Sequence, residues 1–501
     1  MILRTMGKYK LQRCIWSGII SILLVIITSP FLQAQVSPKR GYGYGYNSVA
    51  DLQEMATGCS WWYNWAAFPD GTVQSVYQNI GVEFVPMSWG GTPDYNTLMS
   101  QIPSGAKYLL GFNEPNFTTE ANMTPQVAAQ RWPVLQQVAQ SKGLKLVAPA
   151  VNYCGGGCNQ TDPIAWLDTF FLSCTNCQVD FIAIHWYQCT GGGLTWDLSQ
   201  FKKYGKPLWL TEFACGTGSP TVAAQQTYMT EALSILENDP DVYRYAWFAG
   251  RTTSVPNASL LGNSGQFTSL GQTYASLPFP ALIQVPGIIQ SENYYRRLGV
   301  NTETCTDTGG GLDVGWTSSG DFMDYNLNIA SAGTFNFFFR IASLSGGGSF
   351  HLELDDKVIS TSIAVPITGA WQAWSTINLN NLSLPAGNHL LRVVVESGGF
   401  NMNYINTVQT SVTTALLPGV LLEEIKLYPN PFQGSFTIDF STSIGLQKVE
   451  IFQSSGMLVN SYQGSDLNQG TLLIGENLGN GIYFVKCTGN DGVKVSKIIK
   501  N

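Results

Sequence analysis

Two short stretches of the sequence place a glutamate directly after an apolar run. Glu114 lies in Gly111-Phe-Asn-Glu-Pro-Asn116, and Glu212 follows Trp209-Leu-Thr. Pro115 has no amide donor and restricts the residue before it, so the strand that leads to Glu114 must end there. Two carboxylates across a sugar ring are the groups that glycoside hydrolysis needs, one to donate a proton and one to attack or to activate water. We therefore take both glutamates as candidate catalytic residues.

The elements that must position these glutamates run from Arg40 to about Phe279, where short apolar strands alternate with helical stretches such as 125–141 and 221–237. We expect eight strands, at residues 41–46, 59–65, 82–89, 108–113, 144–151, 181–187, 207–213 and 242–248. Strands that alternate with helices indicate a parallel sheet, and this number fits a closed (β/α)8 barrel. Glu114 then ends the fourth strand and Glu212 the seventh, so both face one mouth of the barrel.

Aromatic side chains gather near the expected strand ends: Trp61, Trp62, Trp65, Trp89, Trp186, Tyr187 and Trp247. Flat apolar faces with polar edges stack well on sugars, although any one of these rings can instead belong to the core. The late positions of Trp89, Trp186 and Trp247 in their strands favour substrate binding for these three, and we include Tyr187 with them.

His185 precedes two of these rings and is expected either to orient Glu212 or to bind substrate, with a purely structural role as the alternative. The chain has only three histidines. A His-ligated metal or a Ser-His-Asp triad therefore has little to build on, and we expect no cofactor in catalysis.

The stretches Gly111-Phe-Asn-Glu-Pro-Asn116 and Leu210-Thr-Glu-Phe213 resemble the two catalytic motifs of glycoside hydrolase family 128. The resemblance covers residues 40–279 and includes Trp61-Trp-Tyr-Asn-Trp65 and His185-Trp-Tyr187. It implies a retaining endo-β-1,3-glucanase in which Glu114 is the acid/base and Glu212 the nucleophile.

Asn113 agrees with this assignment, because its amide can bind the sugar 2-hydroxyl beside the reacting centre. The same barrel acting on another β-glycan, and a non-catalytic adhesin that only holds polysaccharide, are the alternatives. The presence of both carboxylates favours an enzyme.

The composition favours a β-rich extracellular protein. Charged residues make up only 12% of the 501 residues, aromatic residues another 12%, and there are 52 glycines. That balance is typical of extracellular β-rich proteins. The net charge of -7 offers no basic surface for nucleic acid, which makes it an improbable partner. The family resemblance implies β-glucan as the partner, and we expect a monomeric chain.

The amino-terminal residues have the layout of a secretory signal, which we place at residues 1–34. Arg4, Lys8, Lys10 and Arg13 precede an apolar run from Ile15 to about Ile27. A membrane anchor is the alternative, although the run is short for one. We expect a protein that is secreted or attached to the cell surface.

Nine of the ten cysteines follow this segment. The spacing of Cys154, Cys158, Cys174 and Cys177 allows either zinc or disulfides, and export favours disulfides. An odd number leaves at least one thiol that is free or paired elsewhere, and the connectivity stays open.

Residues 283–409 change to short strands separated by glycine turns, which indicates a β-sandwich. Their motifs, such as Gln290-Ser-Glu-Asn-Tyr294 and Phe400-Asn-Met-Asn-Tyr-Ile405, resemble a family 6 carbohydrate-binding module with a jelly-roll fold. The resemblance implies that Trp316 and Trp371 hold a sugar between them, that Asn401 hydrogen-bonds it and that Glu303 lines the same cleft.

The same resemblance implies a structural Ca²⁺. The positions concerned are Gln290, Glu292 and Asn403, of which only Glu292 is a carboxylate. Amide oxygens still ligate Ca²⁺, but the lower negative charge should weaken the site.

A linker at residues 410–422 precedes a last unit of alternating strands at 423–501. With Leu427-Tyr-Pro-Asn-Pro-Phe432, Gly481-Ile-Tyr-Phe-Val485 and the basic end Lys494-Val-Ser-Lys-Ile-Ile-Lys500, this unit resembles the C-terminal sorting domain of type IX secretion, with an immunoglobulin-like sandwich fold. The resemblance implies passage through outer-membrane secretion machinery. A third binding sandwich is the alternative.

Overall fold

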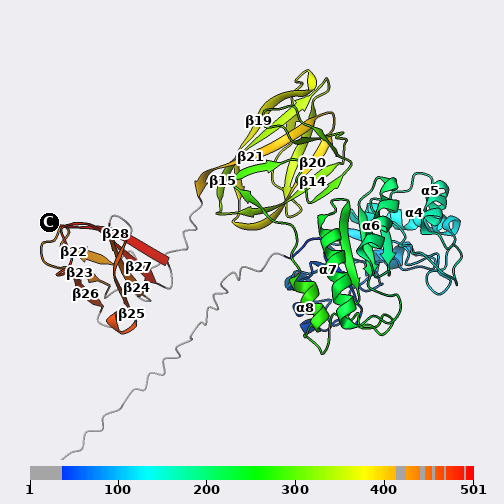
Figure 1. Cartoon of the computed structure of the whole chain (residues 1–501), viewed down its shortest axis with the longest axis horizontal. Helices are drawn as coiled ribbons and strands as arrows, with labels where there is room; N and C mark the ends of the chain where they lie inside the picture. The colour runs from blue at the N-terminus through cyan, green and yellow to red at the C-terminus, as the bar shows by residue number, and fades with distance from the viewer. Residues whose placement is uncertain (1–35, 413–424, 441–445, 454–456, 468–469, 490–491) are drawn as a thin grey trace, which may run out of the picture. The chain divides into compact units, whose positions relative to one another are not determined.

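The computed structural model describes residues 36–412, 425–440, 446–453, 457–467, 470–489 and 492–501. The expected signal segment 1–34 and most of the expected linker 410–422 lie outside the described residues. The chain forms two compact units, of which the first runs as far as Thr410 except for residues 331–334, and the second starts at Ser411. The first unit contains an α/β domain followed by an antiparallel β-sandwich (Figure 1).

The α/β domain alternates eight strands with eight helices. The strands are β1 (Arg40–Gly43), β2 (Trp61–Tyr63), β3 (Glu83–Phe84), β4 (Tyr108–Leu110), β5 (Lys145–Val147), β6 (Ile182–Trp186), β7 (Leu208–Phe213) and β8 (Val242–Phe248). The helices are α1 (Val49–Met55), α2 (Tyr77–Ile80), α3 (Tyr95–Gln101), α4 (Pro125–Lys142), α5 (Pro163–Ser173), α6 (Gly191–Phe201), α7 (Val222–Asn238) and α8 (Ser269–Ser276), with a 3-10 turn η1 (Lys202–Tyr204) after α6. Figure 1 shows α4 to α8 along the outside of this domain.

The eight strands are parallel and close into a ring. Six form one sheet in the order β3-β2-β1-β8-β7-β6, and β4 pairs with β5. Parallel bridges from Met87 to Leu110 and from Val147 to Phe181 join the pair to the sheet on both sides. The carboxyl ends of β4 and β7 therefore open at the same mouth, as the sequence register requires.

The ring is filled by a core of its own. Trp61, Tyr63, Tyr108, Trp209 and Tyr243 are buried in one cluster inside it. The indole of Trp61 fits inside the ring because residue 41 is glycine. A Cβ at position 41 would lie only 2.3 Å from the Trp61 ring.

The observed elements follow the expected ones closely, apart from strand ends. Helix α4 begins after Thr124 and α7 after Thr221, and in both the threonine hydroxyl accepts a backbone hydrogen bond from the first turn. Most strands are shorter than expected at their carboxyl ends, because the chain leaves the sheet there to form the loops of the mouth.

The β-sandwich of the first unit has two sheets around a hydrophobic core. One contains β10 (Gly287–Gln290), β12 (Asn301–Thr304), β13 (Leu312–Gly315), β15 (Gly333–Ser343), β19 (Ala370–Leu384) and β21 (Asn401–Val412). The other contains β9 (Ile283–Val285), β11 (Arg296–Leu298), β14 (Phe322–Ile329), β16 (Gly348–Leu354), β17 (Lys357–Val358), β18 (Ile363–Val365) and β20 (Gly387–Ser397). Almost all their pairings are antiparallel, as expected for this module.

Within the first unit, side chains of the sandwich contact the α/β domain. Phe322 packs against Tyr243, with ring centroids 6.1 Å apart. Arg297 forms an ion pair of 2.8 Å with Asp241. Tyr295 donates a short hydrogen bond to the buried Glu237. Because side chains of the sandwich find their packing and polar partners in the α/β domain, the two domains stabilise each other.

The second unit forms two smaller sheets around a separate core. The first has β22 (Lys426–Tyr428), β23 (Phe436–Asp439) and β26 (Thr471–Ile474), and the other has β24 (Leu446–Gln453), β25 (Leu458–Gln463), β27 (Gly481–Gly489) and β28 (Gly492–Lys500). A 3-10 turn, η3 (Gly464–Leu467), follows β25.

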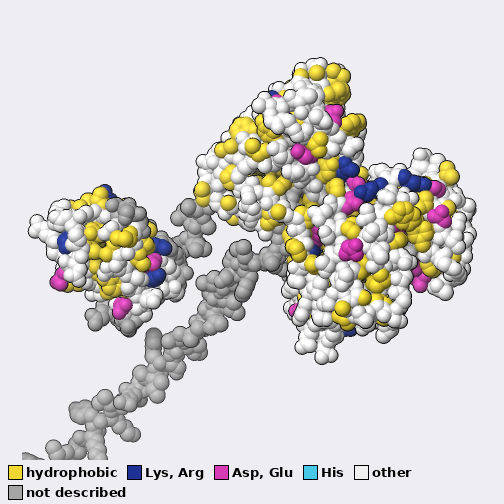
Figure 2. Space-filling model, viewed as in Figure 1, with side chains coloured by type: hydrophobic (Ala, Val, Ile, Leu, Met, Phe, Trp, Pro, Cys, Tyr) yellow, Lys and Arg dark blue, Asp and Glu magenta, His cyan; other side chains and the backbone are white. Residues whose placement is uncertain are grey.

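Charged side chains are sparse on the face drawn in Figure 2, where Lys and Arg lie among Asp and Glu. Among the residues that the structure describes, no helix is long and apolar enough to span a membrane.

Candidate active site

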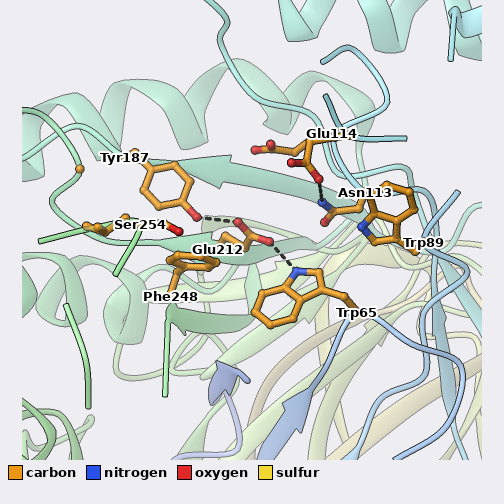
Figure 3. Close-up of a pocket in the computed structure, with 11 residues that line it drawn as sticks. Trp65, Trp89, Asn113, Glu114, Tyr187, Glu212, Phe248 and Ser254 are labelled. Carbon is orange, nitrogen blue, oxygen red and sulfur yellow. Dashed lines mark hydrogen bonds between the residues drawn. The ribbon is translucent and has the colours of Figure 1, made fainter. Parts of the chain in front are cut away.

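The largest concentration of candidate residues lies in one pocket at the mouth of the ring (Figure 3). It is lined by Trp65, Trp89, Asn113, Glu114, Glu120, Tyr187, Glu212, Gly216, Phe248, Ser254 and Val255. Both candidate glutamates are therefore present, together with the predicted Asn113, Trp89 and Tyr187.

Glu212 is held by β7, whose six residues are all buried. Three groups donate to its carboxylate: the Tyr187 hydroxyl at 2.5 Å, the Trp65 indole N–H at 2.8 Å and the Tyr63 hydroxyl at 3.2 Å. Figure 3 shows the first two of these contacts. Donors of this kind stabilise the ionised form of a carboxylate.

Glu114 stands where the chain turns out of the ring after β4, in a left-handed conformation with φ of 38°. Its Oε1 accepts a hydrogen bond of 3.2 Å from Nδ2 of Asn152. The loop that carries Asn152 is tied back by Asn116, whose Nδ2 donates to the Asn152 carbonyl at 2.7 Å. Such a strained, tethered position is common at functional sites.

His185 lies between the two glutamates and is fully buried as a side chain. Its Nδ1 is 2.9 Å from Oε1 of Glu114 and 3.5 Å from Oε2 of Glu212. One ligand atom from each of the three residues lies within 4.8 Å of the others. His185 was expected to orient Glu212 or to bind substrate, and the structure places it closer to Glu114 than to Glu212.

The three groups influence one another's protonation. Burial lowers the pKa of His185, but Glu212 and Glu114 outweigh it and the net pKa is raised. Burial raises the pKa of Glu114, yet the hydrogen bond and charge of His185 lower it overall. For Glu212, burial raises the pKa and the charge of Glu114 raises it further, while His185, Tyr187 and Trp65 oppose this. The protonation of each of these three groups therefore depends on the charge of the other two.

A metal ion is a poor fit between these three residues. The Glu212 carboxylate is already surrounded by O–H and N–H donors, whose positive ends would repel a cation. The arrangement suits proton transfer and nucleophilic attack instead.

The prediction that the rings of Trp186 and Trp247 bind substrate is wrong. Trp247 is 0% exposed and packs against Phe213, and its indole N–H donates to the Ala258 carbonyl at 2.8 Å. Trp186 is 6% exposed and faces Gly193 at the start of α6. Successive residues of a strand point to opposite faces, so these rings turn toward the helices while their neighbours Phe248 and Tyr187 turn into the pocket.

Sequence reasoning assigned no role to several residues that the structure brings to the site, namely Tyr63, Glu120, Asn152, Gly216, Phe248, Ser254 and Val255. Trp65 was expected only as one of the rings that either bind sugar or belong to the core. Strand alternation could have found Phe248, since it follows the core residue Trp247. Loop positions such as Glu120 carry no comparable signal, because the loop path decides where they lie.

The second predicted cleft, in the β-sandwich, is lined by Glu303, Trp316, Thr317, Trp371, Gly399, Phe400 and Asn401. The two tryptophans are 58% and 43% exposed, which leaves their faces free for a ligand. Nδ2 of Asn401 donates to Oε1 of Glu303 at 2.7 Å, so these two polar groups form the floor of the cleft together. All four predicted residues are thus brought together.

The predicted Ca²⁺ ligands are partly suited to that ion. Oε2 of Glu292 is buried and has no hydrogen-bond partner among the described residues, so this oxygen could ligate a cation. Nδ2 of Asn403 donates to Asp307 at 3.1 Å, and Asp307 is paired with Arg340. Gln290 has an exposed side chain.

Six of the seven cysteines of the α/β domain form disulfides, Cys154–Cys158, Cys174–Cys177 and Cys189–Cys215. The zinc alternative is therefore wrong. Cys59, Cys305 and Cys487 are buried free thiols.

Comparisons with known proteins identify three segments of the chain. A family model of the glycosyl hydrolase catalytic core matches residues 41–274. The family 6 carbohydrate binding module matches residues 290–409, and the secretion system C-terminal sorting domain matches residues 426–501.

Two solved structures are similar to parts of the chain. A GH128 (subgroup II) endo-β-1,3-glucanase from Sorangium cellulosum is 45% identical, with 48% of this chain and 100% of that chain covered and a TM-score of 0.47. A carbohydrate binding module from Cellvibrio mixtus lichenase 5A, solved in complex with cellotriose, is 39% identical, with 25% and 99% covered and a TM-score of 0.24.

Alkali-sensitive linkage protein 1 of Schizosaccharomyces pombe is 30% identical over 260 residues, which are 48% of this chain and 45% of that protein. The chain spans less than half the length of the curated relatives that it matches. Because its α/β domain aligns with the whole of a family 128 enzyme at 45% identity, the chain belongs to glycoside hydrolase family 128, and it also carries a family 6 carbohydrate-binding module and a C-terminal secretion sorting domain.

Proposed function

We propose that the protein is a secreted retaining endo-β-1,3-glucanase. The observation that carries this proposal is the pair of carboxylates of Glu114, which follows β4, and Glu212, which lies on β7. One oxygen of each carboxylate lies within 4.8 Å of the other, beside His185. Retaining enzymes keep their carboxyl groups about 5–5.5 Å apart, while inverting enzymes leave about 6.5–9.5 Å for a water molecule. The β-1,3 linkage is supported by the family 128 relative, which is named for that activity.

In the first step Glu212 attacks the anomeric carbon, and the glycosidic bond breaks as the leaving oxygen takes a proton from Glu114. Oε1 of Glu114 lies 2.9 Å from Nδ1 of His185, so a proton can pass between these two groups. In the second step Glu114 accepts a proton from water, and the water hydrolyses the glycosyl ester of Glu212. Asn113 binds the 2-hydroxyl, where the contact strengthens in the transition state.

The experiment that tests this proposal is hydrolysis of a panel of linear β-glucans by the purified chain. We expect short oligosaccharides from a β-1,3-glucan, with no release from Glu212→Ala on any substrate. Glu114→Ala should be least harmful to kcat/KM on a substrate with an activated leaving group, because the first step then needs no proton from Glu114. Cleavage of a different β-glycan alone would favour the other linkage, and binding without cleavage would favour an adhesin.

The sandwich module binds glucan in this proposal, through the exposed faces of Trp316 and Trp371. Its test uses the full chain made inactive by Glu212→Ala, because the module shares buried contacts with the α/β domain. In native gels that contain soluble β-1,3-glucan this chain should be retarded. A further Trp371→Ala change should remove most of the retardation, since a methyl group cannot replace the stacking area.

A structural Ca²⁺ in the module would be held by Glu292 and Asn403, with Gln290 at the edge. It would supply positive charge for the unpartnered Glu292 oxygen and take no part in catalysis. Addition of Ca²⁺ to chelator-treated protein should raise the thermal midpoint, and Glu292→Gln should abolish the increase. An equal increase in the variant would exclude this site.

Export by a type IX system, with release or surface attachment, completes the proposed function. It is supported by the match of the last 76 residues to a secretion system C-terminal sorting domain.

A further inference from the structure

The loop after β4 brings a third carboxylate, Glu120, to the wall of the active-site pocket. The loop folds back on the strand that it leaves: the Phe117 amide donates to the carbonyl of Glu114 at 2.9 Å, and the Ala121 amide donates to the carbonyl of Asn113 at 3.2 Å. Glu120 therefore lies beside residues that are next to each other in the sequence and that carry the proposed chemistry.

The side chain of Glu120 makes one direct contact with this machinery. Nδ2 of Asn113 donates to Oε2 of Glu120 at 3.3 Å. Asn113 is only 4% exposed, and its Oδ1 is buried with no hydrogen-bond partner in the part of the chain that the structure describes. An ionised carboxylate can only accept, so the contact fixes which end of the Asn113 amide is the NH₂ group.

Glu120 is also within electrostatic reach of the catalytic pair. Burial raises the pKa of Glu120, and the charges of Glu114 and Glu212 raise it further, while Asn113 and His185 lower it. The interaction is mutual, so an ionised Glu120 disfavours loss of the proton that Glu114 must give.

We propose that Glu120 is a positioning residue for the hydrolytic reaction: it holds the amide of Asn113 so that the remaining N–H is available to the 2-hydroxyl of the sugar whose bond is cleaved. The inference rests on the proposed function, since Asn113 has this role only in a glycosidase. One N–H of the amide is engaged by Glu120, which leaves the second for the substrate.

The test compares an aryl laminaribioside with its analogue that lacks the 2-hydroxyl on the sugar beside the aryl group. We expect Glu120→Gln to lower kcat on the parent compound about tenfold, because a neutral amide no longer dictates the orientation of Asn113. On the 2-deoxy analogue the same change should alter kcat less than about threefold, because that substrate has no hydroxyl for Asn113 to bind. A role in stability alone would lower both rates equally.

Two further variants sharpen the result. Glu120→Asp keeps the charge and the acceptor, so it should preserve more of the preference for the 2-hydroxyl than Glu120→Gln. Thr119→Ala changes the exposed neighbour in the same loop and should leave the preference intact. If Glu120→Gln discriminates between the two substrates as well as the unchanged protein does, the inference is wrong. If the unchanged protein cleaves neither, the proposed function fails instead.

Discussion

At the scale of single residues, the fold holds several candidate site residues in a backbone conformation that their side chains disfavour. Glu114, Trp65 and Trp316 all take a left-handed backbone conformation, with φ of 38°, 60° and 56°. Residues other than glycine rarely adopt this backbone conformation, so the surrounding fold must impose it. The indole of Trp65 consequently reaches Glu212 from a position that strand periodicity does not predict.

The pH dependence of catalysis tests the role of His185, which faces Glu114, Glu212 and Glu120. The positive charge of His185 lowers the pKa of Glu212. Glu212 must be ionised to attack, so its pKa sets the acidic limb of kcat/KM. His185→Gln removes the charge and should move this limb to higher pH by about one unit, with an activity loss of about tenfold or more.

The measurement is a pH profile of kcat/KM for both proteins on one soluble β-1,3-glucan. An acidic limb that stays in place, or that moves to lower pH, contradicts the electrostatic role of His185. A loss of rate without any shift would leave His185 as a structural residue only.

At the scale of elements, the alternation of short apolar strands with helical stretches located all eight strands of the α/β domain, together with α4 and α7. It did not decide which face each aromatic ring occupies, so Trp186 and Trp247 were assigned to the wrong side. A strand that ends in aromatic residues has the same sequence pattern whether its rings lie in the core or bind substrate. Only the register of the closed ring separates them.

Adjacent residues of β8 should therefore respond differently to truncation. Trp247→Ala removes a fully buried ring and should lower the free energy of unfolding by about 3–5 kcal/mol. Phe248→Ala removes part of the pocket wall, so it should mainly raise KM for glucan and change stability much less. Chemical denaturation and steady-state kinetics on both variants check this. A large KM effect from Trp247→Ala in folded protein would contradict the assignment of its ring to the core.

At the scale of the whole molecule, composition and motifs predicted the order of three functional segments, which the family matches confirm. The buried contacts of the sandwich with the α/β domain were not predicted. Tyr295 and Arg297 pair with Glu237 and Asp241, yet no local pattern in the sequence links such distant residues. Long-range pairings of this kind follow from the packed fold alone.

The second unit should be dispensable for chemistry, because none of those of its residues that the structure describes lines either cleft. A chain that ends at Ser411 should keep its glucan hydrolysis and its glucan binding, yet accumulate in the periplasm of the native host. Fractionation of cells that express the truncated and full chains measures this. Normal external activity from the truncated chain would show that the unit is not the sorting signal.

The central claim is that Glu114 and Glu212 carry out a double displacement on a β-1,3-glucan. Proton NMR of a laminari-oligosaccharide during its first minutes of hydrolysis by the full chain tests it most directly, because two successive inversions conserve the anomeric configuration. We predict that the new reducing end appears first as the β-anomer, with the α-anomer rising later by mutarotation. Initial release of the α-anomer would contradict the account.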